Sequence, residues 1–216
     1  MKNKDIAIVG AGGFGKEVKM LIDGINKQKS IYNLIGFYDD GLEKGTKVNG
    51  CPVLGQVCDI NNYQNDLAIT VAVGDPVLKL KLLNKINNPF VTYPTLIHPT
   101  VIIGEDSVSI GEGCILLPGN MLTVNINIGC YVSMHLNCTV GHDTKIDDYC
   151  SFMPGVNVSG EVVIGEGVYA GTGASIINQM KIGRWTIIGA GAVVSSSLPE
   201  KCTAVGVPAR PIKFND

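Results

Sequence analysis

The chain has 216 residues, of which 45% are hydrophobic and 17% charged, as in a folded protein of one or two domains. Its 17 basic and 19 acidic residues give a net charge of −2, which argues against nucleic acid as the main partner. No apolar run reaches the roughly 18 residues of a membrane span, and the N-terminus becomes a glycine-rich loop too early for a signal peptide. Seven scattered cysteines without a C-x-x-C pair predict neither disulfides nor a zinc or other metal site, so a reducing cytoplasm is the expected compartment.

Residues 1–93 carry the pattern of a small Rossmann-like βαβ domain. Short apolar runs alternate with segments whose apolar residues recur on one helical face, which predicts an α/β fold. The expected strands are 5–9, 34–38, 67–73 and 90–93, and the expected helices are 16–27 and about 77–86.

A glycine-rich loop in this domain predicts a phosphate site. Gly10, Gly12 and Gly15 form G-x-G-x-x-G between a strand and a helix. Glycines let the backbone approach a phosphate, and the helix N-terminus offers N–H groups. Asp39 follows the second strand, where a carboxylate can bind a ribose. A tight turn without ligand and an NAD site are the alternatives. A dinucleotide needs two such halves, and about 90 residues suffice for one, which favours a nucleotide or nucleotide-sugar.

The second half of the chain has an internal repeat of six residues. Every sixth position from Ile110 to Val194 is apolar. This period fits neither a helix nor strand alternation, but it fits a strand of about four residues followed by a two-residue corner. Three such strands would close a triangular coil. Glycine often follows the apolar position, and we expect these glycines to supply the backbone angles of the corners.

A coil of eighteen residues gives three apolar columns, each expected to line one inner wall of a parallel β-helix. An earlier strand around Ile97 and Ile103 would add part of a sixth coil, with a one-residue slip before Ile110. The columns are Ile110, Ile128, Ile146, Ile164 and Ile182; Leu116, Met134, Phe152, Ala170 and Ile188; and Leu122, Val140, Val158, Ile176 and Val194.

His142 is the candidate catalytic residue among the three histidines. It lies in Gly141-His142-Asp143, beside a corner and outside the columns, and its neighbours eighteen residues away are Val124 and Gly160. Because Gly160 has no side chain, it leaves room for a ligand beside the imidazole. A neutral imidazole can take the proton of an attacking amine or alcohol, and Asp143 can orient it. A plain surface histidine is the alternative.

The other histidines and the buried cysteines are expected to be structural. His98 lies at the entrance of the repeat, and His135 is expected to be an exposed polar residue, with a substrate contact as the alternative. Cys114, Cys138 and Cys150 fall at an inward-facing small-residue position, which predicts small hydrophobes and no nucleophile.

The hexads resemble those of the hexapeptide-repeat acyltransferases, whose fold is a left-handed parallel β-helix, over about residues 97–210. As a whole, the chain resembles the bacterial sugar O- and N-acyltransferases of the sialic acid and bacillosamine pathways, which are trimers that use acetyl-CoA. The resemblance implies a nucleotide-sugar-binding domain at 1–93 and a β-helix with a C-terminal tail at 94–216. The matching motifs are GAGGFG (10–15), Asp39-Asp40, VAVG (71–74), GHD (141–143), GTGA (171–174), GAGA (189–192) and VGVPAR (205–210).

The resemblance also implies roles for single residues. His142 would be the general base, with its basicity raised by Asp143. Members often carry a second histidine nine residues after the base; here that position is Ser151, whose hydroxyl could still donate to the thioester carbonyl. The implied nucleotide-sugar contacts are Gly12, Gly13, Phe14, Asp39, Asp40 and Gly74, and the implied acetyl-CoA contacts are Ser151, Thr172 and Ala190.

A basic C-terminal end would suit the phosphates of coenzyme A, or it is simply a solvated face. The residues concerned are Lys181, Arg184, Lys201, Arg210 and Lys213, against Glu200.

The leading hypothesis is a homotrimeric, acetyl-CoA-dependent N-acetyltransferase acting on a UDP-linked 4-amino-sugar. An O-acetyltransferase of a sialic-acid-type sugar is the nearest alternative. A non-catalytic β-helix scaffold that binds a nucleotide is an alternative of another class, for which His142 would be dispensable.

Overall fold

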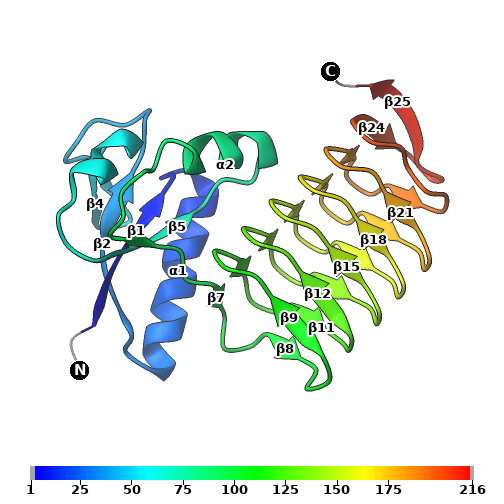
Figure 1. The fold of residues 1–216 in the computed structure, drawn as a ribbon, viewed down its shortest axis with the longest axis horizontal. Helices are drawn as coiled ribbons and strands as arrows, with labels where there is room; N and C mark the ends of the chain where they lie inside the picture. Colours follow the sequence, from blue (N-terminus) through cyan, green and yellow to red (C-terminus); the bar gives the residue numbers. More distant parts are fainter. Residues whose placement is uncertain (1–2, 215–216) are drawn as a thin grey trace. The chain divides into compact units, whose positions relative to one another are not determined.

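The computed structural model describes residues 3–214, which divide into two compact units, Met1–Pro99 and Thr100–Asp216 (Figure 1). Each unit has its own set of buried apolar residues. Across residues 3–214, no helix combines the length and the apolar character needed to cross a membrane.

The first unit is an α/β sheet with strand order β3-β4-β2-β1-β5-β6, in which neighbours are parallel except β3 and β4. A further short strand, β7, contacts helix α1. The elements are β1 (Lys4–Val9), α1 (Gly13–Gln28), β2 (Tyr32–Tyr38), β3 (Lys47–Val48), β4 (Cys51–Gly55), the 3₁₀-helix η1 (Val57–Asn62), β5 (Leu67–Val71), α2 (Pro76–Leu83), β6 (Val91–Thr92) and β7 (Leu96–Ile97).

The central strands are buried on both faces, so β5 is apolar at nearly every position and not alternating. Helix α1 buries Val18, Leu21 and Ile22 on one side. It begins at Gly13 and not at Lys16, because the glycine-rich loop already supplies its first turn. Helix α2 has the expected start signals: Asp75 accepts a hydrogen bond from the N–H of Leu78, and Pro76 follows it.

The sequence analysis missed a hairpin formed by β3 and β4. Its two-residue turn, Asn49-Gly50, has positive φ at both positions (46° and 81°), as a type I′ turn requires. The Asn-Gly pair was the available signal. Strand β4 then extends the sheet beside β2, so four parallel strands become five.

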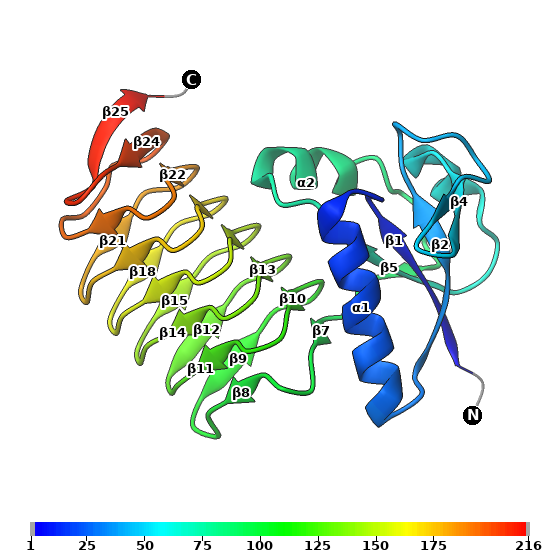
Figure 2. The ribbon, with the colours of Figure 1, turned by 180° about the vertical axis from the view of Figure 1, so that it is seen from behind.

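The second unit is a left-handed parallel β-helix with three faces (Figures 1 and 2). Its strands follow one another around the three faces in turn. Face 1 holds β9 (Val108–Ile110), β12 (Ile126–Ile128), β15 (Lys145–Ile146), β18 (Val163–Ile164) and β21 (Lys181–Ile182). Face 2 holds β10 (Ile115–Leu116), β13 (Ser133–Met134), β16 (Ser151–Phe152), β19 (Tyr169–Ala170), β22 (Ile187–Ile188) and β24 (Cys202–Val205). Face 3 holds β8 (Ile102–Ile103), β11 (Met121–Leu122), β14 (Thr139–Val140), β17 (Asn157–Val158), β20 (Ser175–Ile176) and β23 (Val193–Val194).

The register confirms the eighteen-residue coil. Ile128 pairs with Ile146, and Ile146 pairs with Ile164. All three columns point inward and are at most 3% exposed, except Ile110 at the start of the first column, which is half-buried. The expected slip is present, since Ile103 pairs with Leu122, nineteen residues away.

The role expected of the repeat glycines was wrong. Gly141, Gly165 and Gly171 do not have positive φ; the left-handed positions lie two residues later, at Asp143, Gly167 and Gly173. A Cβ on Gly141 would instead lie 2.6 Å from the backbone nitrogen of Gly160 on the next coil. These glycines are therefore required by the close approach of successive coils.

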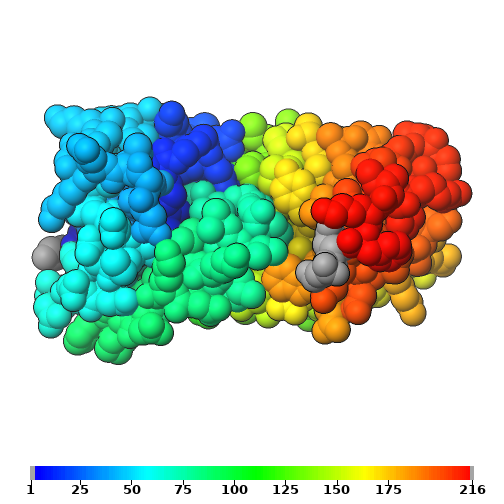
Figure 3. Space-filling view, turned by 90° about the horizontal axis from the view of Figure 1, so that it is seen from above, coloured from blue at the N-terminus to red at the C-terminus, as the bar shows by residue number. Residues whose placement is uncertain are grey.

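A β-hairpin ends the second unit. Strand β25 (Arg210–Phe214) pairs antiparallel with β24, and all five of its residues are exposed. The space-filling view shows this hairpin, in red, at the surface of the last coil (Figure 3). Pro211 on β25 has no N–H to offer along the sheet edge, which limits further strand pairing there.

Candidate active site

His142 lies at a corner of the β-helix between faces 3 and 1. We call residues 141–144, between β14 and β15, the His corner. The corner is held from both sides, because the Asp143 N–H donates to the Val124 carbonyl at 3.1 Å and the His142 carbonyl accepts from Glu161 N–H at 2.7 Å. The imidazole itself is 56% exposed. A fixed backbone thus presents an accessible ring.

The contact with Asp143 decides the tautomer of His142. The imidazole Nδ1 lies 2.7 Å from Oδ2 of Asp143. An ionised carboxylate can only accept, so Nδ1 carries the proton and Nε2 of the neutral ring keeps its lone pair. Hydrogen bonds from His142 and then from Asn125 lower the pKa of Asp143, which keeps the carboxylate charged at neutral pH. The ring can therefore accept a proton at Nε2.

Gly160 lies against this ring, as the eighteen-residue period predicts. A Cβ at position 160 would lie 2.5 Å from Nε2 and 2.6 Å from Cε1 of His142. Any larger residue would displace the imidazole. The absence of a side chain at position 160 of the neighbouring coil thus allows the imidazole its place.

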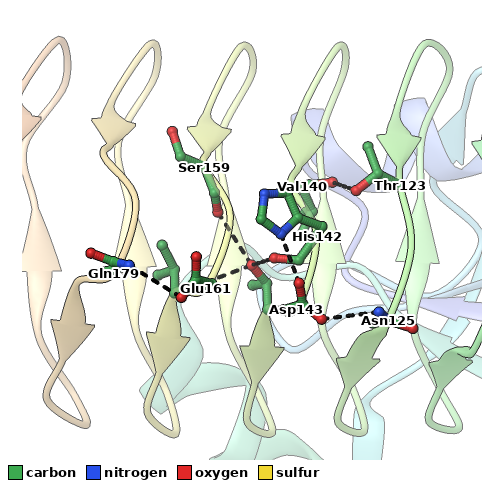
Figure 4. Close-up of polar contacts among 10 residues, drawn as sticks. Thr123, Asn125, Val140, His142, Asp143, Ser159, Glu161 and Gln179 are labelled. Carbon is green, nitrogen blue, oxygen red and sulfur yellow. Dashed lines mark hydrogen bonds and ion pairs between the residues drawn. The ribbon is translucent and has the colours of Figure 1, made fainter.

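A polar ladder runs along this corner, at the third residue after the end of each of four successive strands of face 3, β11, β14, β17 and β20. Asn125 donates from Nδ2 to Oδ1 of Asp143 at 3.0 Å, and Gln179 donates from Nε2 to Oε2 of Glu161 at 3.2 Å (Figure 4). The sequence analysis missed Asn125, although it lies one coil before Asp143 and the period pointed to it.

The expectation that His135 is exposed was wrong. Its side chain is only 6% exposed, so it is part of the buried set on face 2. His98 fits its structural role: a Cβ on Gly24 of α1 would lie 2.8 Å from its Nε2, and burial lowers its pKa. Of the three histidines, only His142 presents its ring to solvent in this way.

The cysteines of the repeat are buried hydrophobes. Cys114, Cys138 and Cys150 are fully buried, and burial raises the pKa of Cys138 to about 11. A thiol with that pKa stays protonated at neutral pH and is a poor nucleophile.

The residues expected to contact acetyl-CoA do not share one place. Thr172 and Ala190 are exposed and lie one above the other at the corner between faces 2 and 3. There the backbone carbonyl of Thr172 accepts a hydrogen bond from the Gly191 N–H at 2.8 Å. The His corner is a different edge of the prism. Ser151 is fully buried and shares a hydrogen bond of 3.0 Å with Ser133, which does not support the expected contact with a ligand.

The basic C-terminal residues are also dispersed. Lys181 and Arg184 line a groove of about 840 Å³ on the last coils of face 1, together with the acids Asp147 and Glu166. Arg184 forms an ion pair of 2.7 Å with Glu200. Arg210 and Lys213 lie apart from this groove, on β25. The groove carries both signs of charge, so its role toward a phosphate stays a prediction.

The first unit has a pocket of about 500 Å³ at the glycine-rich loop, which we call the loop pocket. The G-x-G-x-x-G loop, the start of α1 and the β3–β4 hairpin enclose it. Its lining is Ala11, Gly12, Lys16, Asp39, Gly41, Leu42, Thr46, Lys47, Val48 and Asn49. Lys16 and Lys47 are cations that sequence reasoning did not assign, and Lys47 depended on the missed hairpin.

The glycines of the loop divide into two kinds. Gly10 has φ +97°, and a Cβ on Gly15 would collide with the Gly10 carbonyl oxygen, so these two are required by the turn itself. A Cβ on Gly12 or Gly13 would meet nothing within 4 Å. The open space beside Gly12 and Gly13 is where a ligand can approach the first N–H groups of α1.

The two aspartates after β2 have different surroundings. Asp39 lines the loop pocket, and its carboxylate accepts from the N–H groups of Ala11 (2.7 Å) and Gly41 (2.9 Å). Asp40 lies outside that pocket, where it accepts from Val57 N–H at 2.9 Å and from the Lys85 ammonium at 2.8 Å. Asp40 therefore anchors the chain after β2 to Val57 and Lys85, and its implied contact with a nucleotide-sugar stays a prediction.

The two other implied contacts lie near the loop but outside the lining of the loop pocket. Phe14 is the second residue of α1 and is half-buried. Gly74 is half-buried and lies between β5 and α2. It lies at the carboxyl end of β5, beside β1, where ligands bind in open α/β sheets.

Comparisons with known proteins match both units. The PglD N-terminal domain family matches residues 5–86. GDP-perosamine N-acetyltransferase of Escherichia coli O157:H7 is 35% identical over 214 residues, which cover 95% of this chain and 95% of that protein.

Solved structures match nearly the whole chain. The acetyltransferase domain of PglB from Neisseria gonorrhoeae FA1090, in complex with acetyl coenzyme A, is 32% identical with a TM-score of 0.89, and the match covers 98% of this chain and 100% of that one. PerB from Caulobacter crescentus, in complex with CoA and GDP-perosamine, is 29% identical with a TM-score of 0.83 and 97% of both chains covered.

The anchoring role of Asp40 predicts a pH-dependent loss of stability in Asp40→Asn. The Lys85 ammonium and the Val57 N–H lower the pKa of Asp40 in the folded chain. The contribution of Asp40 to the free energy of unfolding is therefore fully present above the pKa that its carboxyl has in the unfolded chain. This contribution is lost as the pH falls through the lower pKa that the carboxyl has in the folded chain. Thermal unfolding should show a reduced midpoint for Asp40→Asn at pH 7 and a shrinking difference on acidification. Asp66→Asn, at an exposed position, is the control. A difference independent of pH would contradict this account.

Proposed function

Because the chain belongs to the family of hexapeptide-repeat sugar acyltransferases, we propose that it transfers the acetyl group of acetyl-CoA to the amine of a nucleotide-linked amino-sugar. The observation that carries the proposal is the His142–Asp143 pair on an exposed corner, with Nε2 ready to accept a proton. The E. coli relative, matched over 95% of both chains, is named an N-acetyltransferase, which favours an amine over a hydroxyl as the acceptor.

The reaction is a direct transfer. The amine nitrogen attacks the thioester carbonyl carbon, and the carbon–sulfur bond breaks as the amide forms. Nε2 of His142 takes the proton that the nitrogen loses, and the CoA thiolate can receive it afterwards. Asp143 stabilises the imidazolium that forms in between. No cysteine intermediate is required, in agreement with the buried, protonated thiols of the repeat.

The loop pocket is the proposed site for the nucleotide part of the substrate. Its cations, Lys16 and Lys47, and the N-terminus of α1 would face the phosphates, and the first turn of α1 has no acidic residue to oppose them. The Asp39 carboxylate accepts hydrogen bonds from two backbone N–H groups, so its oxygens have further lone pairs. These would accept hydrogen bonds from the hydroxyl groups of a ribose and orient it.

A further part of the proposal concerns which nucleobase, uracil or guanine, the nucleotide-sugar carries. The sequence resemblance predicts a UDP-linked 4-amino-sugar, and the E. coli and Caulobacter relatives carry GDP-perosamine in their names. Mixing the protein with acetyl-CoA and matched UDP- and GDP-amino-sugars, and following free thiol release, tests both. Absence of thiol release with every amino-sugar would contradict the proposal.

We also propose that the working form is a cytoplasmic homotrimer. The His corner and the Thr172 corner are different edges of one prism, so a neighbouring subunit would have to bring one edge to the other. Sedimentation should give three times the 22.9 kDa mass of one chain. The mass of a single chain at micromolar concentration would overturn this part of the proposal.

His142→Ala should lower kcat by roughly 10²–10⁴-fold, the usual contribution of a positioned base. The KM values of both substrates should change little, because the ring acts on the proton and not on binding. Steady-state kinetics with each substrate varied in turn would measure both effects.

His135 is buried and is unsuitable as a control for that experiment. Asn178 occupies the same corner position two coils further on and is exposed. Asn178→Ala should keep kcat. Equal losses in the two variants would mean that the corner matters as structure and that His142 is not the base.

Gly13→Val should raise the KM of the nucleotide-sugar and leave that of acetyl-CoA unchanged. The chain itself has room for the side chain, since nothing lies within 4 Å of a Cβ there. The valine would occupy the open space at the start of α1, beside the loop pocket, where the substrate is proposed to approach. Kinetics with each substrate varied in turn, with thermal unfolding as the check on folding, would measure this. An equal rise in both KM values, or none, would place the nucleotide elsewhere.

A further inference from the structure

We propose that Asn125 is a positioning residue of the acetyl transfer: it holds Asp143 in the orientation that keeps the proton of His142 on Nδ1. The inference rests on the proposed function of the His corner. It adds to that function a residue from a different coil, which touches neither the imidazole nor the reacting atoms.

The geometry uses both oxygens of one carboxylate. Asn125 donates to Oδ1 of Asp143 at 3.0 Å, and Nδ1 of His142 lies 2.7 Å from Oδ2 (Figure 4). Only the amide NH₂ of Asn125 can face a carboxylate, so the direction of the first bond is fixed. With one oxygen held by Asn125, the carboxylate plane is set, and the other oxygen points at the ring.

Asp143 needs such a support because it lies at the surface. Its side chain is 51% exposed, and that of His142 is 56% exposed. A pair of exposed groups gains little from its own contact, since water competes and two side chains must be ordered. A second bond from the preceding coil restricts Asp143 before the ring engages it. The lowered pKa of Asp143, to which Asn125 contributes after His142, agrees with this arrangement.

The rest of the ladder provides a matched control. Glu161 is the other charged side chain of this corner on the neighbouring coil, and Gln179 donates to it at 3.2 Å as Asn125 does to Asp143. Both amide residues have positive φ, 54° for Asn125 and 65° for Gln179. Glycine tolerates that backbone in either place. Asn125→Gly and Gln179→Gly therefore remove one amide each, from the same corner, with the same backbone requirement.

The first readout is kinetic. Asn125→Gly should lower kcat about tenfold through the misplaced base, while both KM values stay within a few-fold. Gln179→Gly should keep the wild-type kcat, since Glu161 does not touch the imidazole in any hydrogen bond of the corner. Asn125→Asp is a second variant that fits the same backbone and cannot donate to Asp143 at neutral pH, so it should lose activity in the same direction.

The second readout does not depend on activity. The chain has three histidines, so the ¹⁵N spectrum of labelled imidazoles is simple, and His142→Ala assigns the signal of interest. His142 in the wild type should be mostly the Nδ1–H tautomer at a pH where the ring is neutral. A free imidazole favours Nε2–H, and Asn125→Gly should move His142 toward that form. Gln179→Gly should leave the spectrum unchanged.

The outcomes separate the two proposals. An unchanged tautomer in Asn125→Gly would overturn the positioning role, and so would equal losses of kcat in the two glycine variants. A shifted tautomer in a protein that shows no acetyl transfer would instead mean that the proposed function is wrong. Unfolding midpoints of both glycine variants would show whether the fold is equally preserved, and Asn125→Asp decides the matter if Asn125→Gly does not fold.

Discussion

The stacking of one coil on the next is the constraint from which the rest of the second unit follows. Parallel pairing at eighteen residues places each side chain over the one that holds the same position in the preceding coil, as Ile146 lies over Ile128. Apolar side chains fill the interior because every inward position repeats. Where two backbones lie close together, as at Gly141 and Gly160, no side chain fits between them. Burial of apolar area stabilises this arrangement, and the close contacts fix its register.

The same register assembles the site. Three coils contribute residues to the site around His142. Asn125 comes from the first coil, His142 and Asp143 from the second, and Gly160 from the third. None of these residues is brought there by a loop of its own. Backbone hydrogen bonds on both sides hold the corner, so the ring is accessible to a substrate although its support is rigid. A base that is fixed before the substrate binds needs little reorganisation during the reaction.

The periodic part of the molecule was predictable because its information is local and repeated. The three columns, the slip at Ile103 and the proximity of Gly160 to His142 all follow from counting residues. The failures are of another kind. His135 and Ser151 are outward-facing positions of the repeat, and the period does not determine whether such a position is buried.

In the first unit, two neighbouring aspartates look alike in sequence. Asp39 faces the loop pocket while Asp40 pairs with Lys85, and only the chain path after β2 separates them. Lys47 entered the pocket through a hairpin whose signal, Asn49-Gly50, was present in the sequence and overlooked.

The corners also explain why a positioning residue fits this fold so readily. Each corner needs a residue with positive φ, and Asn125, Asp143, Glu161 and Gln179 all supply it, with φ between 54° and 65°. For residues other than glycine such angles cost about 1–2 kcal/mol, less for Asn and Asp. Hydrogen bonds between successive side chains offset part of that cost, as stacking does for Tyr131 and Tyr149, whose ring centroids are 5.6 Å apart. The contact that relieves the strain at Asn125 and Asp143 is the same contact that would aim the base. The contacts that orient His142 are therefore ones that the repeat already forms for its own stability.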